Sequence, residues 1–136
     1  MKRSELREHI FKVLFGIEFN EDGALTEQSE LYLSDLEHAK ESETEYIGNK
    51  VQKVAERISE IDELINANSK GWKTTRMNKV DLTILRLAVY EMKWDEEVPT
   101  GVAINEAVEL SKTYSGEEGS AFVNAVLGKI AHSQEE

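Results

Sequence analysis

The residues best suited to chemistry in this chain are its lysines and arginines, because half of them lie in two short basic segments. Residues 1–17 carry four bases and two acids, a net charge of +2, whereas residues 64–79 carry four bases and no acid. The bases of the second segment recur at every third position, as Lys70, Lys73, Arg76 and Lys79. Two interpretations stay open: the segments are two halves of one anion-binding surface, or both are ordinary solvated charge.

The remainder of the chain is strongly acidic. Residues 18–63 have a net charge of −10 and residues 80–136 a net charge of −7, which makes the whole chain −11. Charges farther apart than the Debye length, about 8 Å at physiological salt, are largely screened from each other. The overall negative charge therefore does not exclude a local basic surface that binds nucleic acid.

The residue types of familiar catalytic and metal sites are scarce. The chain has no cysteine, which excludes disulfides, thiolate metal sites and a cysteine nucleophile. Its three histidines, His9, His38 and His132, are widely separated, and Asp35-x-x-His38 is the nearest approach to a metal-binding spacing. No phosphate-binding glycine loop or G-x-S-x-G motif occurs. We therefore expect an interaction module rather than an enzyme, without a metal or cofactor.

The length and composition suit one helical domain in the cytoplasm. The chain has 136 residues, 40% of them hydrophobic, and its apolar runs are too short to span a bilayer. Its first residues mix acids and bases, unlike a signal peptide. A cysteine-free chain of this kind fits a reducing compartment.

Apolar residues recur at helical spacing along the first half. The spacing predicts a helix over 3–19, a turn at 20–23, and a shorter helix carrying Leu31, Leu33 and Leu36, with Thr26 as its N-cap. A long helix then begins at a capping box, Ser42-x-x-Glu45, and ends at 66–71. Its apolar stripe consists of Ile47, Val51, Val54, Ile58, Ile61 and Ile65.

The second half predicts three more helices. A strongly apolar, central helix begins with Asn78 or Asp81 as its cap and runs through Met92. Pro99 stands in the first turn of the next helix, which ends near 114–116, and a last helix begins near Ser120. We expect an all-α bundle of six or seven helices in one domain, residues 1–136, with sub-bundles of about 1–67 and 78–132 joined by a basic connector, 68–77.

Four blocks in the second half resemble the NusB family: VDLTILRLAVYEM at 80–92, Val98-Pro99, VAINEAVEL at 102–110 and FVNAVL at 122–127. The resemblance implies two packed three-helix bundles and a role in bacterial transcription antitermination. Family members act with the ribosomal protein NusE, bind the boxA element of nascent ribosomal RNA leaders as single-stranded RNA, and join an RNA polymerase antitermination complex. Members occur as monomers or dimers, so a homodimer is also compatible with the resemblance.

The resemblance also implies which residues contact these partners. Those at the RNA are bases of the two basic segments together with residues near the start of the last helix: Lys2, Arg3, Arg7, Lys12, Lys73, Arg76, Glu118, Phe122 and Asn124. Those facing NusE are Phe15, Asp81, Arg86 and Glu91.

Structural roles compete with several of these assignments. Phe122 has core spacing with Val126 and Ile130, and Arg86 is either a buried ion-pair partner or an edge contact. Asn105 and Glu106 carry the family signature, yet they also suit a helix-end hydrogen bond and an ion pair. Two further functions stay open, the NusB-like RNA-binding domain of a ribosomal RNA cytosine methyltransferase and a purely protein-binding helical scaffold.

Overall fold

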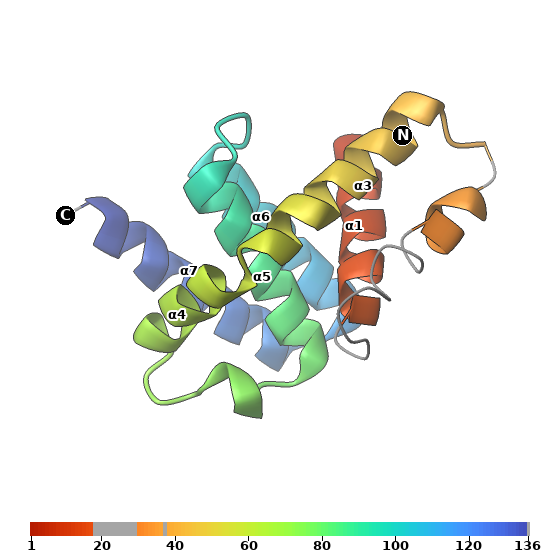
Figure 1. The fold of residues 1–136 in the computed structure, drawn as a ribbon. Helices are drawn as coiled ribbons and strands as arrows, with labels where there is room; N and C mark the ends of the chain where they lie inside the picture. Colours follow the sequence, from red (N-terminus) through yellow and green to blue (C-terminus); the bar gives the residue numbers. More distant parts are fainter. Residues whose placement is uncertain (18–29, 37, 136) are drawn as a thin grey trace. The chain divides into compact units, whose positions relative to one another are not determined.

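The computed structural model describes residues 1–17, 30–36 and 38–135, and within these ranges every regular element is a helix. The chain divides into two compact units, Met1–Glu56 and Arg57–Glu136. Figure 1 shows the helices of both units, coloured along the sequence. The all-α prediction is confirmed.

The first unit contains α1 (Arg3–Ile17), a short helical stretch at residues 30–34 and α3 (Glu41–Glu56). The helices α1 and α3 pack against each other, and each contributes apolar side chains to the core: Ile10, Phe11, Val13, Leu14, Ile47, Val51 and Val54. The hydroxyl of Tyr32 lies 2.7 Å from Nδ1 of His9, which ties the short stretch to α1. The N-terminal ammonium pairs with Glu43 of α3 and lowers the pKa of that carboxyl.

The helix starts in this unit test the predicted caps. The first helix begins at Arg3 as predicted, whereas residues 18–19, the turn at 20–23 and the Thr26 cap lie outside the described residues. The capping box at Ser42 was wrong, because α3 begins one residue earlier, at Glu41. The side chain of Glu43 instead accepts a hydrogen bond from the N–H of Lys40, at 2.8 Å.

The predicted long helix is interrupted at Arg57. This residue has φ −115° and ψ 15° and separates α3 from α4 (Ile58–Asn68), so the prediction of one continuous helix was wrong. Val54 and Ile61 are both fully buried on the two sides of the break. The Arg57 guanidinium lies 4.7 Å from the ring centroid of Trp94 and 3.3 Å from Glu60. A one-residue break leaves the apolar stripe in phase, so hydrophobic periodicity alone does not reveal it.

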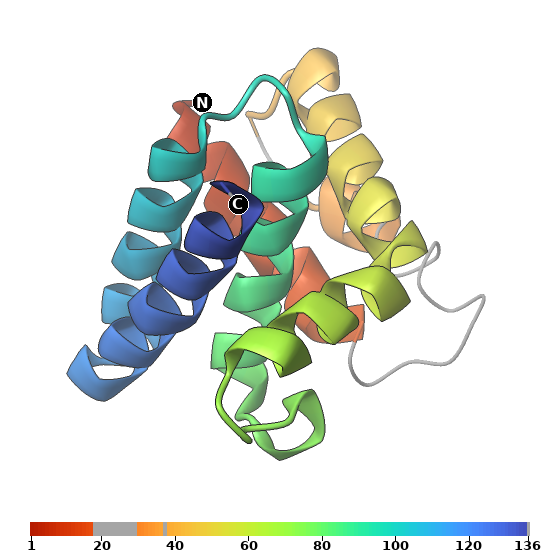
Figure 2. The same ribbon diagram turned by 90° about the vertical axis from the view of Figure 1, so that its left-hand side faces the viewer.

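The second unit is built around α5 (Lys79–Trp94), which contacts α4, α6 (Thr100–Tyr114) and α7 (Glu117–Glu135). Its many buried side chains confirm the predicted central position. Figure 2 shows α6 and α7 running side by side. These two helices bury Ala103, Ala107, Val123 and Leu127 in the core of this unit. None of the described helices is both long and apolar enough to cross a membrane.

Of the three helix starts in this unit, that of α5 is as predicted and those of α6 and α7 differ. Asn78 is the N-cap of α5: its Oδ1 accepts from the N–H of Asp81 at 2.8 Å, and its Nδ2 donates to Asp81 Oδ2 at 2.9 Å. Pro99 precedes α6 as its N-cap rather than standing in the first turn. The last helix begins three residues earlier than predicted, at Glu117, directly after Gly116 with φ +107°.

Along the chain, the boundary between the two compact units falls at the α3–α4 break, between Glu56 and Arg57. The predicted connector, 68–77, therefore lies within the second unit, together with α4. The described helices divide into three in the first unit and α4, α5, α6 and α7 in the second. This places the whole acid-free segment, residues 64–79, in one unit with α7.

Candidate nucleic-acid interface

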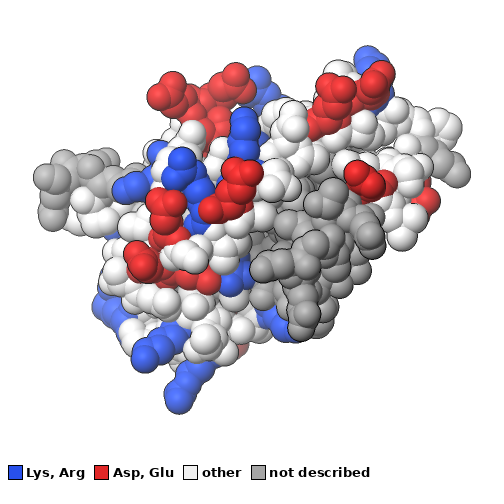
Figure 3. All heavy atoms as spheres, viewed as in Figure 1, with Lys and Arg blue, Asp and Glu red and all other residues white. Residues whose placement is uncertain are grey.

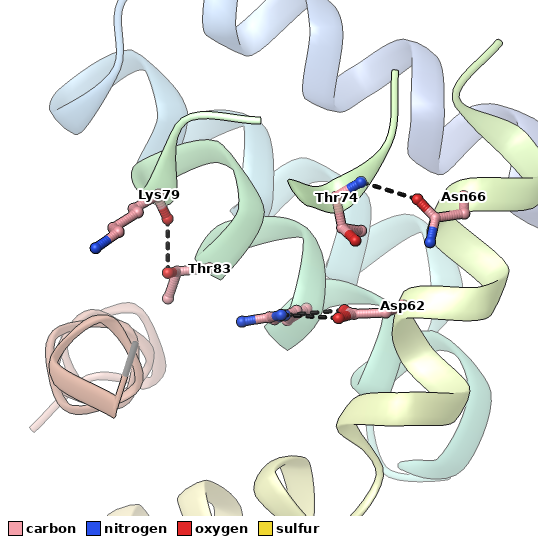
Figure 4. Close-up of polar contacts among 6 residues, drawn as sticks. Asp62, Asn66, Thr74, Lys79 and Thr83 are labelled. Atoms are coloured by element: carbon pink, nitrogen blue, oxygen red, sulfur yellow. Dashed lines mark hydrogen bonds and ion pairs between the residues drawn. The ribbon is translucent and has the colours of Figure 1, made fainter. Parts of the chain in front are cut away.

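The basic connector is a compact turn anchored on the end of α4. After the helix ends at Asn68, Lys70 and Gly71 adopt left-handed backbone angles, φ 48° and 88°, and reverse the chain. A short 3₁₀ turn, η1 (Thr74–Arg76), then leads to α5. The N–H of Thr74 donates to Oδ1 of Asn66 at 2.8 Å, as Figure 4 shows, so the far side of the turn is tied back to α4.

The bases of this turn are exposed and have no acidic partner among the described residues. Lys70, Lys73 and Arg76 are all exposed, and no acid of the described part of the chain pairs with them. Figure 3 shows lysine and arginine side chains gathered at the lower edge of the view, where the turn and η1 lie, with most acidic side chains above them. The turn thus presents to solvent positive charge that no described acid neutralises.

A cleft of about 450 Å³ opens beside the turn. Its walls come from the turn and η1 (Trp72 and Arg76), from α5 (Asp81) and from the first turns of α7 (Glu118 and Phe122). The cleft therefore brings together three predicted RNA-contact residues: Arg76, and, more than 40 positions later in the chain, Glu118 and Phe122. Phe122 is half-buried, so it contributes to packing and to the cleft wall at once.

The inner wall of the cleft contains a buried carboxylate. Asp81 is 6% exposed, and its Oδ1 has no hydrogen-bond partner among the described residues. A Cβ at Gly119 would lie 2.9 Å from this oxygen and 1.9 Å from Ser115 Oγ. Glycine is therefore required where the first turn of α7 closes over Asp81.

Arg86 forms the ion pair that the sequence left as one of two alternatives. Its Nε donates to Asp62 Oδ1 at 2.9 Å and its Nη2 to Oδ2 at 2.8 Å, so the guanidinium of α5 clasps α4 (Figure 4). Burial raises the pKa of Asp62 to about 6 and lowers the pKa of Arg86, which shows that desolvation opposes both charges. Glu91, on the same helix, is only 2% exposed.

The N-terminal basic segment offers fewer available charges. Lys2 and Arg3 are exposed at the start of α1, but Arg7 is only 7% exposed. Lys12 is exposed and lies 3.8 Å from Glu8. Phe15 is half-buried, with its ring 6.2 Å from that of Phe11. This segment belongs to the first unit and the connector to the second, so a surface shared by both remains a prediction.

A family model describes almost the whole chain. The NusB family model matches residues 4–132, which include α1 except its first residue, the connector and all of the cleft. The chain belongs to the NusB family.

Curated NusB-family relatives match along their full length. The transcription antitermination protein NusB of Agathobacter rectalis is 50% identical over 131 residues, which cover 96% of this chain and 100% of the relative. That of Lachnoclostridium phytofermentans is 46% identical over 130 residues, covering 96% and 98%.

Solved NusB structures share the fold. NusB of T. maritima superposes with a TM-score of 0.88 at 34% identity, covering 97% of this chain and 92% of the other. Antitermination factors NusB and NusE in complex with dsRNA include a chain with a TM-score of 0.85 at 25% identity, covering 96% of each.

Sequence reasoning from the NusB resemblance missed Trp72. This side chain is 59% exposed and lines the cleft that holds Arg76 and Phe122. The available signal was a tryptophan inside an acid-free basic segment, a combination that suits nucleic-acid contacts.

The remaining candidate residues lie on α6 and α7. Asn124 is exposed on α7. Of the two signature residues on α6, Asn105 is exposed and Glu106 is half-buried. No cluster of metal-ligating side chains occurs among the residues that the structure describes.

Proposed function

We propose that this chain is a non-catalytic transcription antitermination factor that acts with NusE and binds the boxA element of nascent ribosomal RNA leaders as single-stranded RNA. It would join the RNA polymerase antitermination complex in the cytoplasm. The observation that carries the proposal is the juxtaposition of the acid-free connector with the aromatic-walled cleft of α7. The match to NusB proteins along their whole length supports it.

The physical basis of RNA binding is phosphate neutralisation combined with base stacking. Lys73 and Arg76 are exposed cations whose charge no described acid neutralises. On binding, such cations release counterions from the RNA and supply affinity with little sequence information. Unstacked bases can pack on Phe122 and hydrogen-bond to neighbouring polar groups such as Glu118 and Asn124, which supplies sequence preference. Lys2, Arg3 and Lys12 would add phosphate contacts, whereas the burial of Arg7 suits a supporting role.

The residues proposed to face NusE fall into two groups, those that would touch the partner and those that would position the contacting surface. Phe15 is half-buried and offers an apolar surface on α1, and Asp81 lies in the cleft wall of α5. Arg86 is held by Asp62 and Glu91 is buried, so these two residues would position the surface rather than touch the partner. Each of these assignments can be tested separately by substitution.

Fluorescence anisotropy with labelled oligonucleotides tests the function. The protein, with its solution mass measured first to detect a homodimer, is titrated against boxA RNA, a scrambled strand and the corresponding duplex, with and without NusE. We expect boxA RNA to bind more tightly than the scrambled strand, and NusE to strengthen the binding. The logarithm of the binding constant should fall with the logarithm of the salt concentration at a slope of about −4 if six phosphates are engaged. Equal binding of all RNAs under every condition would instead support a protein-binding scaffold.

A further inference from the structure

A second hollow adjoins the cleft and is lined by lysines from two elements. This hollow, of about 250 Å³, shares Trp72 and Phe122 with the cleft and adds Lys70 from the connector turn and Lys129 from α7. Its other lining residues are uncharged: Asn68, Ser69, Ala125 and Val126. The hollow is therefore purely positive, unlike the cleft, which also contains Asp81 and Glu118.

The two lysines lie close to each other, and no acid is among the described residues that line the hollow. Desolvation and the nearby Lys70 ammonium lower the pKa of Lys129. No acid of the described chain pairs with either lysine. Two converging ammonium groups repel each other, and an anion placed between them relieves that repulsion.

Trp72 lies beside these lysines with a fixed backbone and an exposed indole ring. Its backbone N–H donates to the carbonyl of Ser69 at 3.1 Å, and its own carbonyl accepts from the hydroxyl of Ser69. The backbone is thus fixed while the indole stays 59% exposed. The other tryptophan, Trp94, is covered instead by Tyr90, 6.1 Å away, and by Arg57. An exposed aromatic face next to paired cations matches a nucleotide, which has a flat base and a charged phosphate.

We propose that this hollow is a nucleotide subsite for single-stranded RNA, in which Lys70 and Lys129 clasp one phosphate and the base stacks on Trp72. The proposal of this Trp72 subsite rests on the proposed RNA-binding function. It extends the RNA-binding surface along α7, as far as Lys129.

The surface beyond the Trp72 subsite favours a chain of nucleotides over a single small anion. A third hollow, of about 530 Å³, shares Asn68, Ala125 and Lys129 with the subsite and continues along α7 past Asn124 to His132. No acid lines it. The cleft, the subsite and the third hollow therefore form one continuous track, as an extended polyanion requires.

The fluorescence of Trp72 tests the stacking contact directly. In a Trp94→Phe variant, Trp72 is the single tryptophan, so its emission reports on the subsite alone. We expect boxA RNA to quench this emission, and an abasic strand of the same length to bind with much less quenching. Trp72→Ala should weaken RNA binding at least about fivefold and Trp72→Phe should restore most of it. RNA binding that leaves the emission of Trp72 unchanged would overturn the subsite.

Substitution of the lysines tests the phosphate contact. Lys129→Gln and Lys70→Gly should each lower RNA affinity about threefold or more and reduce the salt slope by about 0.7, the value for one phosphate of a single strand. Because both lysines would hold the same phosphate, the double variant should lose less than the two separate losses combined. Lys70 has a left-handed φ that glycine adopts freely, so Lys70→Gly should fold at least as stably as the parent chain.

Lys112→Gln is the matched control, because Lys112 is an exposed lysine of the same unit, on α6, beside Glu109 at 3.5 Å. It should leave RNA affinity unchanged. If the lysine variants of the subsite behave like this control while RNA still binds, the subsite is wrong and the proposed function stands. If NusE quenches Trp72 and RNA does not, the hollow is a protein contact, which also overturns the subsite. If no RNA binds with or without NusE, the proposed function itself fails, and the subsite with it.

Discussion

Arg76 and Arg86 lie ten positions apart in the same unit, yet the structure uses them in opposite ways. Arg86 donates hydrogen bonds to both carboxylate oxygens of Asp62, so its charge is neutralised in an ion pair between two helices. Arg76 stands in η1, exposed at the rim of a cleft, with no acidic partner in the described chain. The residue type is the same, so the difference lies in what each neighbourhood supplies. A cation with no paired acid stays available to a ligand, whereas an ion pair with a half-buried acid gives it a structural role.

The largest expected effect is on the stability that the Arg86–Asp62 ion pair provides. Asp62→Ala leaves the Arg86 guanidinium partly buried without its bidentate partner, and should lower the free energy of unfolding by about 2–4 kcal/mol. Urea denaturation monitored by circular dichroism measures this loss. The double variant Asp62→Leu/Arg86→Met should recover part of the stability, because it removes both charges together. A loss below about 0.5 kcal/mol for Asp62→Ala would show that the Arg86–Asp62 ion pair contributes no more to stability than an exposed surface ion pair.

The next effect concerns the wall of the cleft beside Arg76. Gly119→Ala places a Cβ within 1.9 Å of Ser115 Oγ and 2.9 Å of Asp81 Oδ1, and should cost about 1–3 kcal/mol of stability. Gly128→Ala is the control on the same helix, since a Cβ there meets nothing within 4 Å. It should be neutral or stabilise the protein by up to about 1 kcal/mol. Thermal melting of the two variants compares them, and equal melting temperatures would contradict the close packing of α7 on Asp81.

A third prediction separates binding from folding on the connector side. Lys73→Gln/Arg76→Gln should reduce boxA RNA affinity about tenfold and the salt slope by about 1.4, as expected for two lost phosphate contacts. The free energy of unfolding should change by less than about 0.5 kcal/mol, because both side chains are exposed. Anisotropy titrations at several salt concentrations, together with a urea melt, provide the two readouts. An unchanged salt slope would remove the contrast between Arg76 and Arg86.

The smallest effect is expected at the N-terminal helix. Lys12 lies 3.8 Å from Glu8, so part of its charge is already balanced within α1. Lys12→Gln should therefore change the salt slope by less than about 0.7 and RNA affinity by less than the connector variant does. The same titration series measures this. If Lys12→Gln matched Lys73→Gln/Arg76→Gln, neighbouring acids would not be what sets the availability of a cation.

The helical fold was predictable because its apolar residues recur at helical spacing. Asn78 was also identifiable as a cap, since its side chain can accept from the backbone three residues later. Two features were not predictable. The break at Arg57 preserves the phase of the buried stripe, and the start of α3 depends on Glu43 reaching back to Lys40 rather than on Ser42.

The candidate site was predictable in its charges but not in its geometry. The acid-free run from 64 to 79 is visible in the sequence, and the family resemblance pointed to Glu118 and Phe122. The pairing of Lys70 with Lys129 depends on how the turn after α4 meets α7, which no local pattern encodes. The burial of Arg7 likewise follows from tertiary packing, because nothing in its sequence neighbours, Leu6 and Glu8, marks this arginine as buried.

The open space at Gly128 has a practical consequence in a chain without cysteine. A single cysteine introduced there would be the only thiol in the protein, and it would stand beside Lys129 in the third hollow with no neighbour displaced. A photoreactive label attached to that thiol would mark whichever molecule passes along α7. The position of the covalent adduct on an RNA strand would then report the polarity with which the strand threads past this helix.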